Sequence, residues 1–402
     1  MLAIVGGTVM DAVQREPIAR GVVVVGDEGR IEAVGPLGQV AVPRGTRAID
    51  ASGLTVLPGL IDCHVHLTHD WWNDEPISWP ADVVVDALAN GRRLVESGVT
   101  TARDACGAPA GVRRAFDSGA FPGPRLQVST TAMAITGGDY DFLAYPHDRR
   151  RDTADMPADV VDGVESARGG VRRRVAVGAE WIKVFAAAWT SYPDTEPERP
   201  QFSVEELRAM VEEAADAGIR GVMAHVQRPT SIKRALAAGI RSLEHADLPD
   251  EECMDLMIQL GAVMVAQAIT PEYSEPKPYH ALAATHLRAA AERGVRIALG
   301  SDRPMTVLPH SALAHFAANG LGPVGALRAG TIEGARLLGV DSETGSLEVG
   351  KFADLMLFDG DPLSDPEQWR EPDRVRLSML RGRVMSGGGG DPRPRNQGEA
   401  SR

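Results

Sequence analysis

Six side chains able to bind a metal ion are spread over the middle of the chain, each on or just after an apolar, strand-like stretch. Two of them are histidines one residue apart in the run Pro58–His66. Because side chains alternate with a period of two along a strand, both imidazoles would point to one face and could bind one metal ion. The full set is His64, His66, Lys183, His225, His245 and Asp302. This set predicts metal-assisted hydrolysis.

Lys183 lies in the apolar run Glu180–Phe185, where burial of a charged ammonium group is costly and lowers its pKa. A neutral lysine amine can react with carbon dioxide to give a carbamate, an anion whose two oxygens could bridge two divalent cations. The alternative is that Lys183 pairs with a carboxylate, for which Asp104 and Asp302 are the candidates. We favour the carbamate interpretation.

The elements that must position these side chains alternate between strand and helix. Eight segments have the composition of strands: Val56–Cys63, Gly98–Arg103, Arg125–Ala132, Ala179–Phe185, Ile219–His225, Ile240–His245, Ala262–Ala268 and Val295–Gly300. Helices are expected at Ala81–Glu96, Ser203–Ala217, Thr230–Ala238, Glu251–Leu260, Ala281–Glu292 and Pro323–Leu338. Ser203 and Glu206 form a capping-box pattern at the start of one of them.

This alternation predicts an α/β fold, a parallel (β/α)8 TIM-type barrel, in which the active site lies at the C-terminal ends of the strands. Gly218, Gly239, Gly261 and Gly294 each lie between a helix and the next strand, where a left-handed cap is favoured. An open, doubly wound sheet is the structural alternative. It would place a glycine-rich phosphate turn after the first strand, where this chain has His-Val-His.

Both ends of the chain differ from this middle part and are rich in short strands and glycine turns. The expected strands are Leu2–Val5, Gly21–Val25, Ile31–Val34, Ala48–Asp50, Leu54–Val56, Ala353–Phe358 and Val375–Arg383. The last residues, 386–402, carry a run of glycines followed by Pro, Arg, Asn and Ser, and we expect them to be disordered.

Composition excludes several classes of partner. The chain has 402 residues, 44% of them hydrophobic, and a net charge of −13, which argues against nucleic acid or an anionic membrane as the main partner. Its three cysteines show no paired spacing, so a reducing compartment is expected. With no signal-peptide pattern and no apolar run of ~20 residues, we expect a cytoplasmic protein with a small-molecule substrate. Assembly into a homo-oligomer is left open.

The motifs resemble those of the amidohydrolase superfamily, in its branch of imidazolonepropionase-like hydrolases and metal-dependent Xaa-Pro dipeptidases. The resemblance rests on Pro58–His66, Gly98–Asp104, Trp181–Lys183, His225, Ser242–His245, Gly300–Asp302 and Gly345–Leu355. It implies that residues 58–340 form the catalytic barrel. It also implies a second, smaller β-sandwich domain built from both termini, residues 1–57 and 341–385.

The same resemblance implies two divalent metal ions, most often Zn²⁺, with a CO2-derived carbamate on Lys183. The buried metal ion would be held by His64, His66 and Asp302. The more exposed ion would be held by His225 and His245, and the modified Lys183 would bridge the two. A binuclear hydrolase of a C–N bond is then predicted, acting on an amide, dipeptide, N-acyl amino acid, carbamate or cyclic amide. Metal-activated hydroxide would attack, and Asp302 would carry the proton to the leaving nitrogen.

The substrate stays open because two positions depart from the dipeptidase-like pattern. Those relatives usually have a tyrosine two residues after the histidine of the fifth strand, where this chain has Gln227. Their loop after the third strand usually reads Thr-Gly-Gly-His-Gly-Asp, whereas here Asp139 replaces the histidine. The expected substrate contacts are Asp139, Tyr140, Gln227, Arg228 and Arg303.

Two other functions are weighed against the binuclear hydrolase. A mononuclear deaminase of a heterocycle would bind one ion per chain, and Lys183 on the fourth strand argues against it. A metal-bound scaffold without turnover would tend to lose ligands, and no member of the set is missing here.

Overall fold

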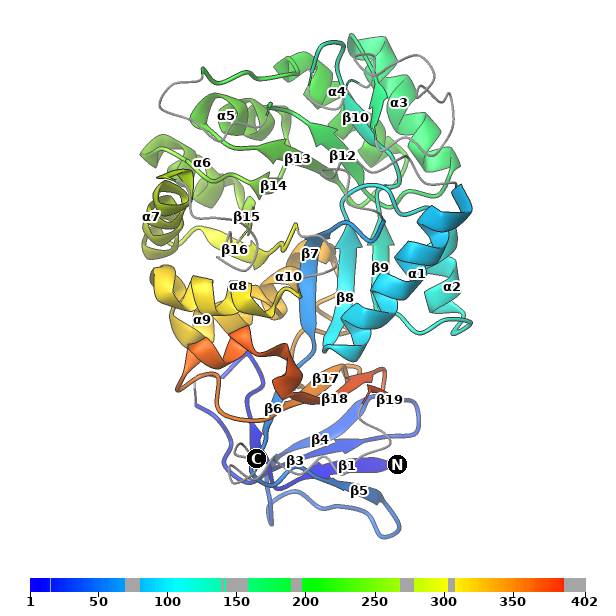
Figure 1. The fold of residues 1–402 in the computed structure, drawn as a ribbon, viewed down its shortest axis with the longest axis vertical. Helices are drawn as coiled ribbons and strands as arrows, with labels where there is room; N and C mark the ends of the chain where they lie inside the picture. Colours follow the sequence, from blue (N-terminus) through cyan, green and yellow to red (C-terminus); the bar gives the residue numbers. More distant parts are fainter. Residues whose placement is uncertain are drawn as a thin grey trace, which may run out of the picture.

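A barrel of parallel strands and helices lies above a smaller β-sandwich along the long axis of the molecule (Figure 1). The computed structural model describes residues 1–14, 16–68, 80–138, 141, 158–188, 197–267, 278–302 and 308–386. No helix in these ranges is both long enough and apolar enough to cross a membrane.

The barrel wall consists of two parallel sheets. The first has the order β7 (Leu60–Val65), β8 (Val99–Asp104), β9 (Arg125–Val128). The second runs β11 (Ala158–Val160), β10 (Ala132–Ala134), β12 (Ile182–Phe185), β13 (Val222–Val226), β14 (Ser242–His245), β15 (Val263–Ala266), β16 (Arg296–Leu299). β7 meets β16 where the backbone N–H of Asp302 donates to the carbonyl of His64 over 2.8 Å. This contact joins the first and last barrel strands.

Helices form the outer layer around these strands (Figure 1). They are α1 (Pro80–Glu96), α2 (Ala110–Asp117), α3 (Val164–Ala176), α4 (Val204–Asp216), α5 (Pro229–Ala238), α6 (Glu251–Leu260), α7 (Pro278–Arg293), α8 (His310–Phe316), α9 (Gly322–Ala329) and α10 (Ile332–Leu338). A π-helical turn follows α8 at Ala317–Leu321, and two short 3-10 helices lie at Pro366–Arg370 and Pro372–Arg374. The predicted capping box of α4 is confirmed, with Ser203 and Glu206 each bonding the other's backbone N–H.

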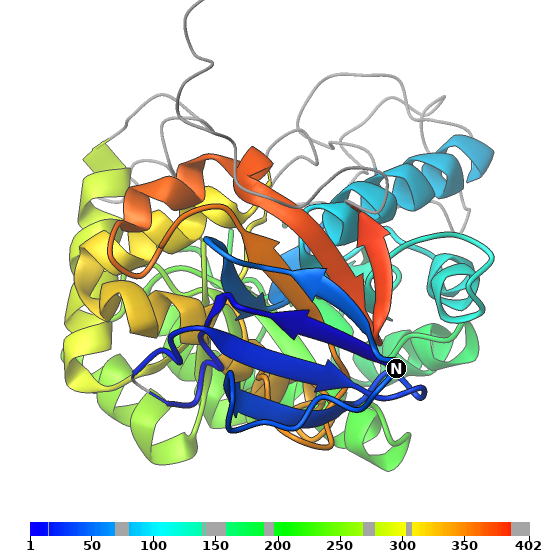
Figure 2. The same ribbon diagram turned by 90° about the horizontal axis from the view of Figure 1, so that it is seen from below.

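Strands from both ends of the chain build the sandwich. One sheet has the order β4 (Ile31–Pro36), β3 (Gly21–Val25), β1 (Leu2–Val5), β5 (Arg47–Asp50). The other has the order β19 (Arg383–Ser386), β18 (Val375–Leu380), β17 (Leu355–Phe358), β6 (Thr55–Pro58), β2 (Thr8–Val9). Figure 2 shows the N-terminal strands in blue beside the C-terminal strands in orange and red, across the lower end of the barrel.

The two sheets of the sandwich share an apolar core of their own. Val23 and Val56 from the N-terminal part pack in it with Leu355 and Leu377 from the C-terminal part, and all four are buried. Burial of this shared apolar surface holds the two ends of the chain together. The predicted fold class, a (β/α)8 barrel with a second domain from both termini, is confirmed, whereas the limits 57/58 and 340/341 stay predictions.

Three predicted strands are each divided into two in the structure. Val56–Cys63 is divided between β6 and β7 at Gly59, where a Cβ atom would lie 2.2 Å from the Thr100 hydroxyl. Arg125–Ala132 is divided between β9 and β10, next to Thr130 in a left-handed conformation with φ of 63°. Val375–Arg383 is a hairpin of β18 and β19, which turns at Arg381 with φ of 49°. In each case a local backbone requirement interrupts a strand-like pattern.

One predicted helix is also divided into two. Pro323–Leu338 is divided between α9 and α10 at Gly330 and Thr331, because Thr331 leaves the helical region with φ of −141° and ψ of −97°. The predicted left-handed glycines are confirmed, with φ between 66° and 102° for Gly218, Gly239, Gly261 and Gly294. The predicted disorder of residues 386–402 falls outside the described residues, except for Ser386 at the end of β19.

Candidate metal centre

The barrel strands bring the six predicted side chains to one end of the barrel. His64 is the last residue but one of β7, and His66 follows that strand directly. Asp302 lies three residues after β16, His225 and His245 lie at the ends of β13 and β14, and Lys183 lies within β12. Parallel strands present their C-terminal ends on the same side, so residues far apart in sequence meet there.

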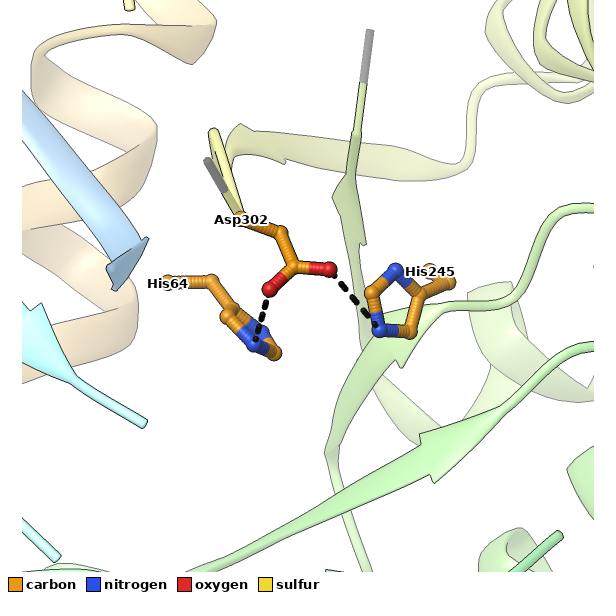
Figure 3. A group of neighbouring side chains, drawn as sticks. All are labelled: His64, His245 and Asp302. Carbon is orange, nitrogen blue, oxygen red and sulfur yellow. Dashed lines mark ion pairs between the residues drawn. The ribbon is translucent and has the colours of Figure 1, made fainter. Parts of the chain in front are cut away.

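Asp302 is the meeting point of three histidines. Its Oδ1 lies 3.1 Å from Nε2 of His66 and 3.3 Å from Nε2 of His64, and its Oδ2 lies 3.8 Å from Nε2 of His245. Figure 3 shows the Asp302 carboxylate between the rings of His64 and His245. The two predicted histidines around Val65 therefore do direct their rings to the same carboxylate.

His225 and Lys183 border this cluster. The ring of His225 lies 4.6 Å from that of His245, measured between centroids, and 5.8 Å from that of Phe185. Nζ of Lys183 lies 3.5 Å from Nε2 of His64. No described carboxylate lies within ion-pairing distance of Nζ, so the alternative pairing of Lys183 with Asp104 or Asp302 is wrong.

Burial sets the charge of these groups. It lowers the pKa of Lys183, lowers the pKa of His225 well below its usual range, and lowers the pKa of His245 to about 3. Neutral imidazole is the form of histidine that binds metal ions. Burial by itself would raise the pKa of Asp302, but the neighbouring His64 and His66 hold it well below its usual range.

Behind His64 lies a fully buried ion pair. Nη2 of Arg103 donates to Oε1 of Glu244 over 2.9 Å, and Oε2 of Glu244 lies 2.6 Å from Nδ1 of His64. The Ser242 hydroxyl also donates to Oε1 over 2.7 Å. A carboxylate only accepts hydrogen bonds, so Nδ1 of His64 carries a proton, which leaves Nε2 on the side of Asp302 as the nitrogen that could bind a metal ion.

Two further buried carboxylates fix the backbone around the centre. Asp62 accepts hydrogen bonds from the N–H groups of His64 and Ser301 over 3.2 and 3.0 Å. Asp104 accepts from the N–H groups of Leu67 and Ala108 over 2.8 and 3.0 Å. Burial raises the pKa of both carboxyl groups to about 6. These bonds hold the segments that carry His64, His66 and Asp302.

The predicted substrate contacts have different positions. Gln227 is 1% exposed, and its Nε2 donates to the hydroxyl of Tyr279 over 2.9 Å. Arg228 is half-buried at the N-terminal end of α5. Asp139, Tyr140 and Arg303 lie outside the described residues. The assignment of all five as substrate contacts stays a prediction.

The supporting roles of Asp62, Arg103 and Glu244 were not predicted from the sequence, and Asp104 was considered only as a partner of Lys183, although all four lie in the motifs quoted above. The signal that could have found them is a charged residue inside a strand predicted to form the barrel wall, which must be paired when buried. Arg103 and Glu244 are both fully buried, and each lies in such a strand. The pairing partner itself lies 141 residues away and leaves no trace in local sequence.

The donor set fits a divalent metal ion. One nitrogen each of His64 and His245 and one oxygen of Asp302 all lie within 4.8 Å of one another. Two ligands bound to one zinc ion at about 2.1 Å lie no more than about 4.2 Å apart, and the three measured contacts of Asp302 satisfy this limit. Imidazole nitrogen and carboxylate oxygen are common zinc ligands.

Comparison with known proteins agrees with this geometry. The model of the amidohydrolase family matches residues 55–385, which include the barrel strands and the second sheet of the sandwich from β6 onwards. The chain belongs to the amidohydrolase family. It is therefore an amidohydrolase, an enzyme that hydrolyses C–N bonds.

Two known enzymes and one solved structure illustrate what this amidohydrolase is similar to. Ochratoxinase from Aspergillus niger is 32% identical over 374 residues, which cover 84% of this chain and 77% of that protein. Imidazolonepropionase from Symbiobacterium thermophilum is 30% identical over 394 residues, covering 89% and 88%. The crystal structure of a prolidase complexed with N-methylphosphonate-L-proline is 31% identical and superimposes with a TM-score of 0.84, covering 95% of this chain and 98% of that one.

Proposed function

We propose that this amidohydrolase is a binuclear enzyme that cleaves an amide-type bond with two divalent ions, most often Zn²⁺. The observation that carries the proposal is the convergence of His64, His66 and His245 on Asp302, with the buried Lys183 beside them. Six metal-competent groups in one small region exceed the needs of a single tetrahedral ion. Lys183 has no carboxylate partner among the residues that the structure describes, and its pKa is lowered, which supports its conversion to a carbamate.

His64, His66 and Asp302 would hold the inner ion, and His225 and His245 the outer ion. The carbamate on Lys183 would bridge the two. When bound, such ions lower the pKa of water and polarise a carbonyl oxygen. The protonated Nδ1 of His64, held by Glu244, keeps Nε2 available as a ligand.

Asp302 is the group that moves the proton. Its pKa lies well below its usual range, so it is ionised at neutral pH. Bound ions would lower the pKa of the attacking water, so that this weakly basic carboxylate could take its proton. Transfer of that proton to the leaving nitrogen completes cleavage of the C–N bond. Its backbone is held by the hydrogen bond to the carbonyl of His64, so the carboxylate stays over the histidines.

N-acyl amino acids and Xaa-Pro dipeptides are the first substrate classes that we propose. The names of the prolidase and the ochratoxinase support them, and the name imidazolonepropionase supports a cyclic amide as the next class. We also propose a cytoplasmic location, which is supported by three buried cysteines that form no disulfide. These choices define a panel of small molecules for the first assay.

The test compares hydrolysis of this panel, with ochratoxin included, by the wild-type protein and by Asp302→Asn. Removal of the proton acceptor should lower kcat by about 10²–10⁴-fold. The matched control is Asp255→Asn, because Asp255 is an exposed carboxylate paired with Arg293 on the surface. Metal content is measured on each sample, and two ions per wild-type chain are expected. Equal turnover by Asp302→Asn would contradict the role of Asp302, and one ion per chain would favour a mononuclear deaminase.

A further inference from the structure

Three buried polar side chains form a cluster next to the metal centre that the mechanism above does not use. Gln227 lies two residues after His225, and Asp247 lies two residues after His245. Tyr279 is the second residue of α7, outside the barrel wall. Their exposed fractions are 1%, 4% and 2%, so each must find its hydrogen-bond partners within the protein.

Hydrogen bonds connect the three side chains. Nε2 of Gln227 donates to the hydroxyl of Tyr279 over 2.9 Å, and that hydroxyl donates in turn to Oδ2 of Asp247. The backbone adds a parallel connection, because the N–H of Leu248 donates to the carbonyl of Gln227 over 2.8 Å. The segments that follow β13 and β14 are therefore joined to each other and to the start of α7.

The segment after β14 needs such support. His245 and Ala246 both have left-handed backbone conformations, with φ of 71° and 49°. A residue other than glycine is strained in that region and persists there only where the surrounding structure holds it. Asp247 directly follows this strained pair, so its bond to Tyr279 fixes the end of the turn that directs the His245 ring towards Asp302.

We propose that Tyr279 is a positioning residue of the metal centre, which acts through Gln227 and Asp247 to hold His225 and His245. The inference rests on the proposed metal-dependent function and adds α7 to the elements that build the site. The phenol does not reach the reacting atoms; it fixes the backbone that carries two ligands. Loss of the hydroxyl alone should therefore weaken metal binding while the tyrosine ring keeps its packing.

The test uses the full-length protein, stripped of metal and titrated with Zn²⁺ against a chromophoric chelator. We expect the weaker of the Zn²⁺ sites to bind its ion about 10-fold less tightly in Tyr279→Phe than in the wild-type protein. This is the lower end of the loss of affinity seen when a residue that supports a metal ligand is removed. With Co²⁺ in place of Zn²⁺, its visible absorption spectrum should also change, because the ligand geometry changes. Thr55→Val is the matched control. It removes a buried hydroxyl bonded to the carbonyl of Gly360 in the sandwich, and should leave both readouts unchanged.

Gln227→Met provides a second variant in case Tyr279→Phe fails to fold. It should reproduce the loss of affinity, and the double variant should be no weaker than the worse single variant, because both changes break one network. Wild-type affinity and an unchanged Co²⁺ spectrum in Tyr279→Phe would overturn the proposal, as would an equal loss in Thr55→Val. If the wild-type protein binds only one ion, the two-metal proposal fails, but the same comparison on that ion still decides the role of Tyr279.

Discussion

Replacement of Glu244 by glutamine tests the support behind His64. The side chain keeps its size but loses its charge, and one of its two acceptor oxygens becomes an NH2 donor. If the NH2 group faces His64, the proton of that ring must move to Nε2, which can then no longer bind a metal ion. If it faces Arg103, two donors oppose each other in a fully buried position.

The size of the effect follows from these contacts. A hydrogen bond to a charged group contributes about 1.5–3 kcal/mol, and Glu244 accepts three of them, from Arg103, His64 and the Ser242 hydroxyl. Removing one partner of a buried ion pair costs about 3–5 kcal/mol. Glutamine keeps one oxygen that can accept part of these bonds, so we expect the free energy of unfolding of the metal-free protein to fall by about 3 kcal/mol, the lower end of that range. Zn²⁺ affinity should fall by about 10–100-fold.

Urea denaturation of the metal-free protein measures the first quantity, and competition with a chelator measures the second. Glu343→Gln is the matched control, because Glu343 pairs with Arg30 in a position where both side chains are more than a third exposed. An exposed pair contributes little to stability, so neither quantity should change in this control. If Glu244→Gln matches the wild type in both stability and Zn²⁺ affinity, Glu244 does not support His64 in the way described above.

Three further predictions concern other parts of the molecule. Lys183→Met should reduce the metal content from two ions per chain to one, measured by elemental analysis, whereas two retained ions would contradict its bridging role. Ser203→Ala should lower the free energy of unfolding by about 1 kcal/mol, since it removes the cap bonded to the N–H of Glu206; an unchanged urea midpoint would contradict this. Burial lowers the pKa of His310 to about 4, so below pH 6.5 the unfolded chain takes up a proton that the folded chain does not. Stability of the metal-free protein should therefore fall from pH 6.5 to 4, by up to about 1.4 kcal/mol per pH unit, and His310→Gln should remove this part of the slope.

The sequence was most informative where one local pattern determined one element. α6 has the predicted bounds, and the left-handed glycines cap the helices as expected. The histidines around Val65 share a face because of strand geometry alone. In each case the deciding interactions lie within a few residues along the chain.

Interactions between distant segments were not predictable in the same way. The Arg103–Glu244 pair and the bond of Tyr279 to Asp247 join residues from separate strands and helices, so no local spacing reveals them. The left-handed conformations of His245 and Asp302 also depend on the surrounding structure, since non-glycine residues rarely adopt them unaided. Such positions are typical of functional sites, where local preferences are overruled.

The central claim is a two-metal centre with a carboxylated Lys183. A crystal structure of the Zn²⁺-loaded protein, with anomalous diffraction at the zinc edge, tests it most directly. We expect two zinc peaks, one within bonding distance of His64, His66 and Asp302 and one within bonding distance of His225 and His245. Continuous electron density for a carbamate on Nζ of Lys183 should connect them. A single zinc peak, or an unmodified Lys183 amine between two peaks, would contradict the claim.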